Sequence, residues 1–265
     1  MRYALGIEYD GSKYCGWQRQ NNVIGVQQKI EEALSKIANE PIEVICAGRT
    51  DTGVNATNQI IHFDTDKVRK DVAWTLGVNT NLPKDIAVSW VKEVNDEFHA
   101  RFSATARRYR YLIYNKPVKQ GLMHDQFTWI RNPLDEQLMD DAAKSLLGEN
   151  DFTSFRAKDC QSHTPFRNIH QISVKRFGDI VMIEVQANAF LYHMIRNIAG
   201  VLIPIGMGKK PVSWTADLLK IKDRSKAGVT AHSDGLYFVG VDYPEKFGIP
   251  SEPWGPVFVE PWLCK

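Results

Sequence analysis

The sequence predicts an α+β protein made of two pseudo-repeated halves, each with an antiparallel-rich sheet and flanking helices. Three observations carry this prediction. The 265 residues, 43% hydrophobic and 24% charged, have the composition of a globular chain that can bury a sizeable core. Strand and helix patterns follow the order β-α-β-β-α-β in the first half. The second half repeats that order loosely. We therefore expect one domain at residues 1–100 and a second at 101–265.

The elements of the first half follow from hydrophobic periodicity. Alternation of apolar and polar residues indicates strands, and apolar residues spaced three and four apart indicate helices. The first alternating run ends in Asp10-Gly11, which is typical of a turn. In chain order, the expected elements are a strand at Arg2–Asp10, a helix at Val26–Ile37, strands at Ile42–Cys46 and Gln59–Phe63, a weaker helix at Arg69–Leu76 and a strand at Ile86–Val94.

The elements of the second half are marked by caps and turns as well. Asn132 and Pro133 suit the cap and first turn of a helix, and Gly148 suits its end. Five prolines after Tyr243 predict a tail that lies extended over a surface. The remaining expected elements are a strand at Arg107–Tyr114, hairpin strands at Ile169–Arg176 and Ile180–Gln186, helices at Phe190–Ile205 and Ser213–Ile221, and a strand at Leu236–Val241.

Composition and motifs exclude several classes of protein. No apolar run approaches the length that spans a bilayer, and the start lacks the layout of a signal peptide, so we expect a cytoplasmic protein without membrane contact. The widely spaced cysteines suit reduced thiols, and a zinc site at Cys160, His163 and His170 lacks a fourth ligand. Phosphate-loop, dinucleotide-binding, serine-hydrolase and zinc-protease motifs are absent from the sequence, so we do not expect a kinase, a Rossmann dehydrogenase, a serine hydrolase or a zinc protease.

Three stretches combine residues that can carry chemistry. The net charge of +2 does not indicate nucleic-acid binding, but the segment 100–110 holds four arginines and no acid. In it, Arg107 and Tyr109 share one face of a strand and Arg108 lies on the other; such interleaving is typical of nucleic-acid binding, or else of a half-buried strand with solvated arginines. The loop around Gln18 mixes aromatic, basic and amide side chains, which suits RNA or an ordinary loop anchored by Trp17.

Three charged residues stand out in the chain, a pair in one loop and an arginine on a helix. In Gly48–Gly53, an extended backbone would point Arg49 and Asp51 the same way, and the guanidinium would favour an ionised carboxylate able to act as base or nucleophile. Spacing alone favours the simpler interpretation, an Asx turn with a salt bridge. Arg196, on an otherwise apolar helix, must meet a carboxylate, a phosphate or water, either in a structural salt bridge or on a route to an anionic substrate.

These motifs together resemble the bacterial tRNA pseudouridine synthase A family from end to end. Six blocks in chain order carry the resemblance. They are Tyr9-Asp10-Gly11 through Gly16-Trp17-Gln18, Gly48-Arg49-Thr50-Asp51 with Gly53-Val54, Phe98-His99-Ala100-Arg101-Phe102 through Arg108-Tyr109, Cys160-Gln161-Ser162 with Thr164-Pro165, Asn188-Ala189-Phe190 through Arg196-Asn197, and Gly235-Leu236-Tyr237.

The resemblance implies a fold, a reaction and a set of site residues. It implies halves whose sheets merge into one central sheet around a basic cleft, and a homodimer that converts uridine to pseudouridine at positions 38, 39 and 40 of the tRNA anticodon stem-loop without cofactor or metal. Asp51 would be the catalytic carboxylate and Arg49 its ion-pair partner. Tyr109 would stack on the uracil and Leu236 would pack beneath it. Further substrate contacts would come from Arg196, Arg107, Arg108 and Gln18.

The sequence departs from the family pattern at two positions and leaves other functions open. Asn55 stands where many relatives have histidine, and Asn58 where glycine is common, so a catalytic histidine is not expected there. A non-catalytic tRNA-binding protein would use the same arginines and aromatic residues without Asp51. A glycoside or nucleoside hydrolase would pair two carboxylates, and no second acid lies near Asp51 in the sequence.

Overall fold

The computed structural model describes residues 1–250 and 255–259 of the chain. Contacts within the chain divide it into two compact units. The first comprises residues 1–107 and the chain from Tyr237 onward, and the second comprises Arg108–Leu236. The domain boundary expected after residue 100 stays a prediction.

The first unit is a mixed sheet with helical segments packed against it. Its strand order is β4-β1-β3-β10, and the short β2 also pairs with β3. β1 is antiparallel to both of its neighbours, whereas β10 runs parallel to β3. The elements are β1 (Arg2–Tyr9), α1 (Val26–Ala38), β2 (Ile45–Cys46), β3 (Asn55–Asp64), the π-helical segment η1 (Ala73–Gly77), β4 (Ile86–Val94), β10 (Leu236–Asp242) and the 3-10 turn η5 (Glu245–Phe247).

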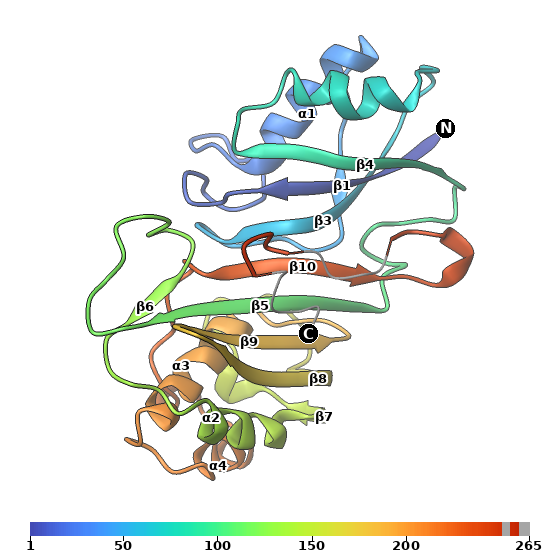
Figure 1. Cartoon of the computed structure of the whole chain (residues 1–265). Helices are drawn as coiled ribbons and strands as arrows, with labels where there is room; N and C mark the ends of the chain where they lie inside the picture. Colours follow the sequence, from blue (N-terminus) through green and yellow to red (C-terminus); the bar gives the residue numbers. More distant parts are fainter. Residues whose placement is uncertain (251–254, 260–265) are drawn as a thin grey trace. The chain divides into compact units, whose positions relative to one another are not determined.

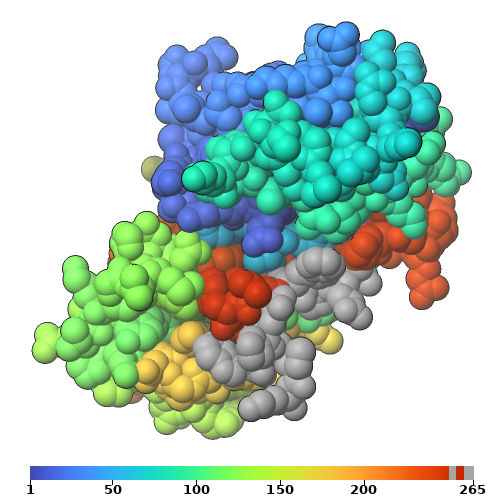
Figure 2. Space-filling view, turned by 45° about the horizontal axis from the view of Figure 1, so that its top comes forward, coloured from blue at the N-terminus to red at the C-terminus, as the bar shows by residue number. Residues whose placement is uncertain are grey.

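The core of the first unit joins α1 and η1 to the sheet. Ile30 and Leu34 are fully buried on the apolar face of α1, as the periodicity predicts. Trp74 on η1 lies with its ring centroid 5.5 Å from that of Tyr3 and 5.2 Å from that of Phe63. Figure 1 shows α1 beside η1, and the residues coloured blue to cyan form one continuous mass in Figure 2.

The second unit is also a mixed sheet with helices against it. Its strand order is β5-β9-β8-β7, and β6 pairs with β5 in parallel. α2 packs against β8, α3 and α4. The elements are β5 (Ala106–Asn115), β6 (Thr128–Ile130), α2 (Glu136–Ala143), η2 (Lys144–Leu146), β7 (Gly148–Asp151), η3 (Thr153–Phe155), β8 (Phe166–Phe177), β9 (Ile180–Ala187), α3 (Met194–Gly206), α4 (Trp214–Ile221) and η4 (Arg224–Lys226).

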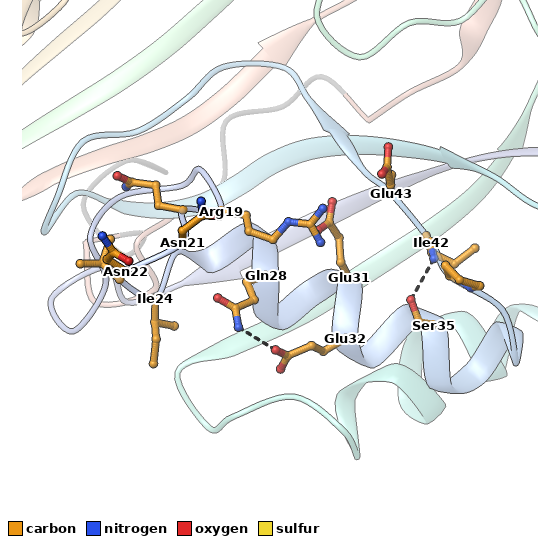
Figure 3. A pocket seen from close by; sticks show the side chains of 13 residues that line it. Arg19, Asn21, Asn22, Ile24, Gln28, Glu31, Glu32, Ser35, Ile42 and Glu43 are labelled. Atoms are coloured by element: carbon orange, nitrogen blue, oxygen red, sulfur yellow. Dashed lines mark hydrogen bonds and ion pairs between the residues drawn. The ribbon is translucent and has the colours of Figure 1, made fainter.

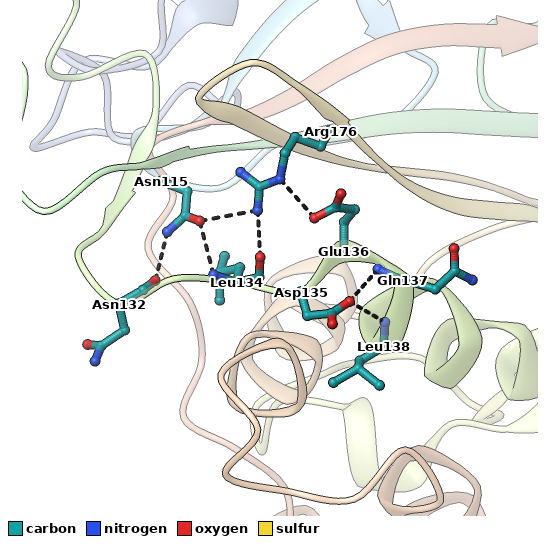
Figure 4. Close-up of polar contacts among 8 residues, drawn as sticks. All are labelled: Asn115, Asn132, Leu134, Asp135, Glu136, Gln137, Leu138 and Arg176. Carbon is teal, nitrogen blue, oxygen red and sulfur yellow. Dashed lines mark hydrogen bonds and ion pairs between the residues drawn. The ribbon is translucent and has the colours of Figure 1, made fainter.

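The start of α2 differs from the expectation. The helix begins at Glu136, and its cap is Asp135, whose carboxylate accepts from two backbone N–H groups of the first turn. The carbonyl oxygen of Asn132 instead accepts a hydrogen bond from the side-chain amide of Asn115 at 2.7 Å. Arg176 holds the connecting segment through the carbonyl of Leu134 at 2.6 Å (Figure 4). The sequence motif at Asn132 is therefore used to anchor the chain, and the helix starts one turn later.

Three further boundaries differ for identifiable reasons. The strand expected at Ile42–Cys46 pairs only over Ile45–Cys46, because side chains of α1 accept the backbone N–H groups of Ile42 and Val44. β3 begins at Asn55, four residues before the expected start. Most of its first residues are polar, so the sequence shows no apolar strand pattern there, although these residues are buried. α3 begins at Met194 because His193 has a left-handed backbone, with φ at 58°.

The class of fold is as expected. The chain is α+β, antiparallel pairs dominate the sheets, and helices flank them. β4 coincides with its expected range, and the hairpin of β8 and β9 turns between Phe177 and Ile180 as predicted. The weak helix expected at Arg69–Leu76 is the π-helical η1. In the tail, η5 is a short turn, and the parts at 251–254 and 260–265 lie outside the described residues.

Candidate functional site

The loop that carries Arg49 and Asp51, Gly48–Gly53, leaves the sheet of the first unit between β2 and β3. At the start of the loop, the Gln59 side chain on β3 donates to the carbonyl oxygen of Gly48 at 2.5 Å. The hydroxyl of Thr50 lies 2.7 Å from the Tyr9 hydroxyl on β1, and both side chains are buried. Two neighbouring strands therefore fix the loop, and they do so through uncharged groups.

A second loop, which follows β1, packs against the first with its backbone. The N–H of Trp17 donates to the carbonyl oxygen of Thr50 at 3.0 Å. Gly16 has φ at 78°, and a Cβ there would lie 2.7 Å from the same oxygen. A Cβ on Gly11 would lie 2.0 Å from the carbonyl oxygen of Val54. Glycine is needed for this approach, which brings two sequence blocks of the motif into one structure.

The aromatic side chain of the second loop serves as an anchor. Trp17 is 2% exposed, and its ring centroid lies 5.9 Å from that of Tyr9. It is therefore not accessible to a nucleobase, and the simpler of the two sequence interpretations holds for this residue. Gln18, the next residue, is exposed and remains the candidate for a substrate contact.

The two charged residues of the Gly48–Gly53 loop lie on either side of the buried Thr50. Asp51 is half-buried and Arg49 is exposed. Burial raises the pKa of the Cys46 thiol to about 12, and the nearby positive charges of Arg49 and Arg101 oppose that rise. The charge of Arg49 therefore lies close to β2. The ion pair between Arg49 and Asp51 stays a prediction.

The two departures from the family pattern lie on β3, directly after the loop. Asn55 is 1% exposed, and its side-chain oxygen accepts from the N–H of Gly11 at 2.8 Å. The side chain of Asn58 is equally buried, and its amide atoms have no hydrogen-bond partner. Asn55 thus joins the two loops, which is a structural role that an amide fills without proton transfer.

Arg107 is the last residue of the first segment of the first unit, and its guanidinium donates hydrogen bonds to backbone carbonyl oxygens. It donates to the carbonyl oxygens of Ala47 at 3.2 Å, Arg101 at 2.7 Å and Ala104 at 3.2 Å. Ala47 directly precedes the Gly48–Gly53 loop. Arg107 therefore ties that loop to the segment between β4 and β5.

In the second unit, the arginines of β5 meet an acid that the sequence argument missed. Arg108 and Arg110 lie on the same face of the strand and donate to the two carboxylate oxygens of Glu184 on β9, at 2.8 and 2.6 Å. The side chains are 19% and 5% exposed. Glu184 is the acidic residue of β9, but the sequence does not indicate that it faces these arginines.

Tyr109 and Arg196 have aromatic and backbone neighbours in the second unit. Tyr109 lies edge-to-face with Phe190, with ring centroids 5.1 Å apart. Arg196, in the first turn of α3, donates to the carbonyl oxygen of Ala231 at 2.8 Å. Burial raises the pKa of Tyr111, and the charge of Arg196 opposes that rise. The guanidinium is thus close to the buried hydroxyl of a β5 tyrosine.

Leu236 lies where the chain passes from the second unit into the first. It is 4% exposed, and its N–H donates to the carbonyl oxygen of Ser233 at 3.0 Å. The preceding Gly235 has φ at 81°, and a Cβ there would lie 2.3 Å from the carbonyl oxygen of Leu112. The next residue, Tyr237, pairs in the first unit with Asn55.

The predicted site residues are divided between the two units. The first unit holds Asp51, Arg49, Arg107 and Gln18, and the second holds Tyr109, Arg108, Arg196 and Leu236. The structure therefore brings the two loops around Thr50 together within one unit. The meeting of Asp51 with Tyr109 stays a prediction.

An open groove of about 810 Å³ in the first unit lies apart from the motif residues. It is bordered by residues 19–24 and the polar face of α1 (Figure 3). Its buried acid, Glu31, accepts from Gln27 at 2.8 Å and from the N–H of Val44 at 3.1 Å, and pairs with Arg19 at 2.9 Å. Both hydrogen bonds go to Oε1, and Oε2 has the ion pair with Arg19, so the carboxylate links α1 to its neighbouring segments.

Within residues 1–250 and 255–259, no cluster of three or more His, Cys, Asp or Glu side chains could hold a metal ion. In the same residues, no helix has the length and apolar character needed to cross a membrane.

Comparison with known proteins identifies the family. Residues 6–103 and 142–244 match the family described as tRNA pseudouridine synthase. The chain is 60% identical over 259 residues to the tRNA pseudouridine synthase A of Colwellia psychrerythraea, covering 98% of this chain and all of that one. The same enzyme of an Enterobacter species is 60% identical over 258 residues, covering 97% and 96%.

Among solved structures, a chain of a Cbf5-Nop10-Gar1 complex is similar over 89% of this chain and 48% of its own length, with a TM-score of 0.37 and 14% sequence identity. The chain belongs to the tRNA pseudouridine synthase family.

Proposed function

We propose that this protein converts uridine to pseudouridine at positions 38, 39 and 40 of the tRNA anticodon stem-loop, with Asp51 as the catalytic carboxylate. The observation that carries the proposal is the Gly48–Gly53 loop. Thr50, the residue before Asp51, is buried and hydrogen-bonded, so Asp51 occupies a defined place at the surface of the unit. A fixed carboxylate is what a reaction on an extruded base requires.

The reaction rearranges the substrate without adding or removing a group. The C1′–N1 bond breaks, the uracil turns, and a C1′–C5 bond forms. A proton leaves C5, and N1 takes one up. Asp51 could attack C6, attack C1′ or remove a ribose proton, and each route needs an ionised carboxylate. Arg49 would favour that ionised form.

The other residues would bind and shape the substrate. The target must leave the stack, at a cost of a few kcal/mol, which stacking on Tyr109 would offset. Leu236 would pack beneath the base, and Arg196 and Gln18 would contact the RNA. Arg108 already pairs with Glu184. It would therefore act on the RNA through the positive charge that it adds to β5, and not through a direct contact. Arg107 would act on the position of the loop through its backbone contacts.

The assembly and location belong to the same proposal. We expect a homodimer that acts on tRNA in the cytoplasm, as the family resemblance implies. A non-catalytic tRNA-binding protein is the alternative, and it would use the same arginines without the carboxylate.

The test uses tRNA labelled with tritium at C5 of uridine. The wild type should release tritium, and Asp51→Asn should abolish release while leaving tRNA binding largely intact. Thr52→Ala, a change at the exposed neighbour, is the matched control and should retain activity. Release at the wild-type rate by Asp51→Asn would remove Asp51 from the mechanism. Tight binding by a wild type that forms no pseudouridine would establish the non-catalytic alternative.

A further inference from the structure

The segment between β4 and β5 presents an aromatic ring to solvent in the first unit. Phe102 is 75% exposed. The Arg101 guanidinium lies 5.5 Å from the centroid of its ring, and the imidazole of His99 lies 4.3 Å from the same centroid. Arg101 is itself exposed. The ring is thus held among polar and cationic groups, which distinguishes it from an apolar patch that would dock another protein.

The backbone of this segment is held at many points. His99 Nδ1 accepts from the N–H groups of Arg101 and Phe102, each at 3.2 Å. The N–H of His99 donates to Ser103 Oγ at 3.0 Å. Arg107 binds the carbonyl oxygen of Arg101 at 2.7 Å. An exposed ring on a segment with satisfied backbone groups loses little conformational freedom on binding.

The segment is also fixed to the sheet beneath it. The N–H of Ala100 donates to Nδ1 of the buried His62 on β3 at 3.1 Å, and the Tyr243 hydroxyl donates to the carbonyl oxygen of Ala100 at 2.6 Å. His62 packs against His99 with ring centroids 4.8 Å apart. The exposed ring of Phe102 therefore rests on the half-buried ring of His99, which packs on the buried ring of His62 on β3, the strand that follows the Asp51 loop.

Two observations connect this segment with the Gly48–Gly53 loop. Arg107 binds the carbonyl oxygens of both Arg101 and Ala47, the residue before Gly48. The charges of Arg49 and Arg101 both act on the thiol of Cys46. The exposed ring and the catalytic loop are thus parts of one rigid region of the first unit.

We propose that Phe102 and Arg101 form a stacking platform for an unpaired nucleotide of the RNA substrate, other than the target uridine. The inference rests on the proposed function, because it names a second contact of the same site with the same RNA. An exposed aromatic ring beside a guanidinium is the arrangement that binds bases of single-stranded RNA. The platform holds a neighbouring nucleotide while the target is extruded.

The test measures binding of a short RNA hairpin that carries 2-aminopurine in its loop. Phe102→Ala should weaken binding about tenfold and reduce the quenching of 2-aminopurine fluorescence. Phe102→Trp should restore both. Phe102→Leu keeps the apolar character without the π face, so it should behave like Phe102→Ala. Arg101→Gln should lower the salt dependence of binding by about one counterion.

The controls separate this inference from the proposed function and from misfolding. Leu76→Ala changes another exposed apolar side chain of the first unit and should bind as the wild type does. Thermal unfolding should be unchanged by Phe102→Ala. Wild-type binding by Phe102→Ala or by Phe102→Leu, or weak binding by Phe102→Trp, overturns the platform. A wild type that forms no pseudouridine overturns the proposed function instead.

Discussion

The two units hold their predicted site residues by different physical means. In the first unit, the Gly48–Gly53 loop is fixed by backbone hydrogen bonds, by buried hydroxyl groups and by glycines where a Cβ cannot fit. In the second unit, Arg108 is fixed by the charge of Glu184, which also binds Arg110, a residue outside the predicted site. Close packing at the glycines leaves no room for an added atom, and it does not depend on the charge of any side chain. Ionic positioning tolerates changes of shape but depends on the charge of one carboxylate.

The largest effect should come from adding a methyl group where glycine lets the two loops of the first unit approach each other. Gly11→Ala places a Cβ 2.0 Å from the carbonyl oxygen of Val54, and backbone cannot move aside cheaply. We expect the free energy of unfolding to fall by about 3 kcal/mol, together with loss of pseudouridine formation. Denaturant unfolding and an assay of the modified tRNA measure the two effects.

Gly121→Ala is the control for that change. Nothing lies within 4 Å of a Cβ at Gly121, so its effect should stay below about 0.5 kcal/mol. A Gly11→Ala protein as stable and active as the wild type would show that the approach of the two loops is not fixed sterically.

The sequence predicted the elements whose patterns are local. β4 and the hairpin of β8 and β9 follow from alternation alone, and α1 follows from its apolar face. It could not predict the cap of α2, because both Asn132 and Asp135 have suitable side chains and tertiary contacts choose between them. The start of β3 was missed since Asn55 and its polar neighbours are buried by the sheet around them.

The candidate site was predictable in its residues but not in its supports. The motif blocks identify Gly16 and Thr50, yet their contact depends on a backbone carbonyl, which no side-chain pattern records. Glu184 was missed for a related reason. Partner strands are paired by the fold, and the sequence does not say which residue of β9 faces Arg108.

The second effect concerns the ion pairs of Glu184 with Arg108 and Arg110 in the second unit. Glu184→Gln leaves two guanidinium groups close together without their counter-charge, and the Arg110 side chain is 5% exposed. We expect the free energy of unfolding to fall by about 2–3 kcal/mol, with most of the cost arising from the buried cation. Denaturant unfolding at low and high salt is the measurement, since salt should reduce the repulsion between the arginines.

Glu149→Gln provides the matched change, because Glu149 is an exposed carboxylate on β7 of the same unit. Its effect should be within about 0.5 kcal/mol. If the two variants were equally stable, the charge of Glu184 would not position the arginines.

The smallest of the three effects tests whether the first unit is indifferent to charge throughout. His62 on β3 is 2% exposed, and its Nδ1 accepts the N–H of Ala100. Burial, and then the charges of Arg2 and His99, lower its pKa to about 4, while Asp64 opposes the shift. The unfolded chain, with a histidine pKa near 6.5, binds the proton first as the pH falls.

Stability from neutral His62 is therefore complete above about pH 6.5 and is lost as the pH falls toward 4. Between pH 7 and pH 5 the expected loss is about 2 kcal/mol. Denaturant unfolding at the two pH values measures it, and His62→Asn, which keeps an acceptor but cannot titrate, should flatten the dependence. An unchanged slope in that variant would assign the pH dependence to other groups. The expected result would place the pH sensitivity of the first unit beneath the segment of Phe102, apart from the hydroxyl and backbone contacts that hold Thr50 in the Asp51 loop.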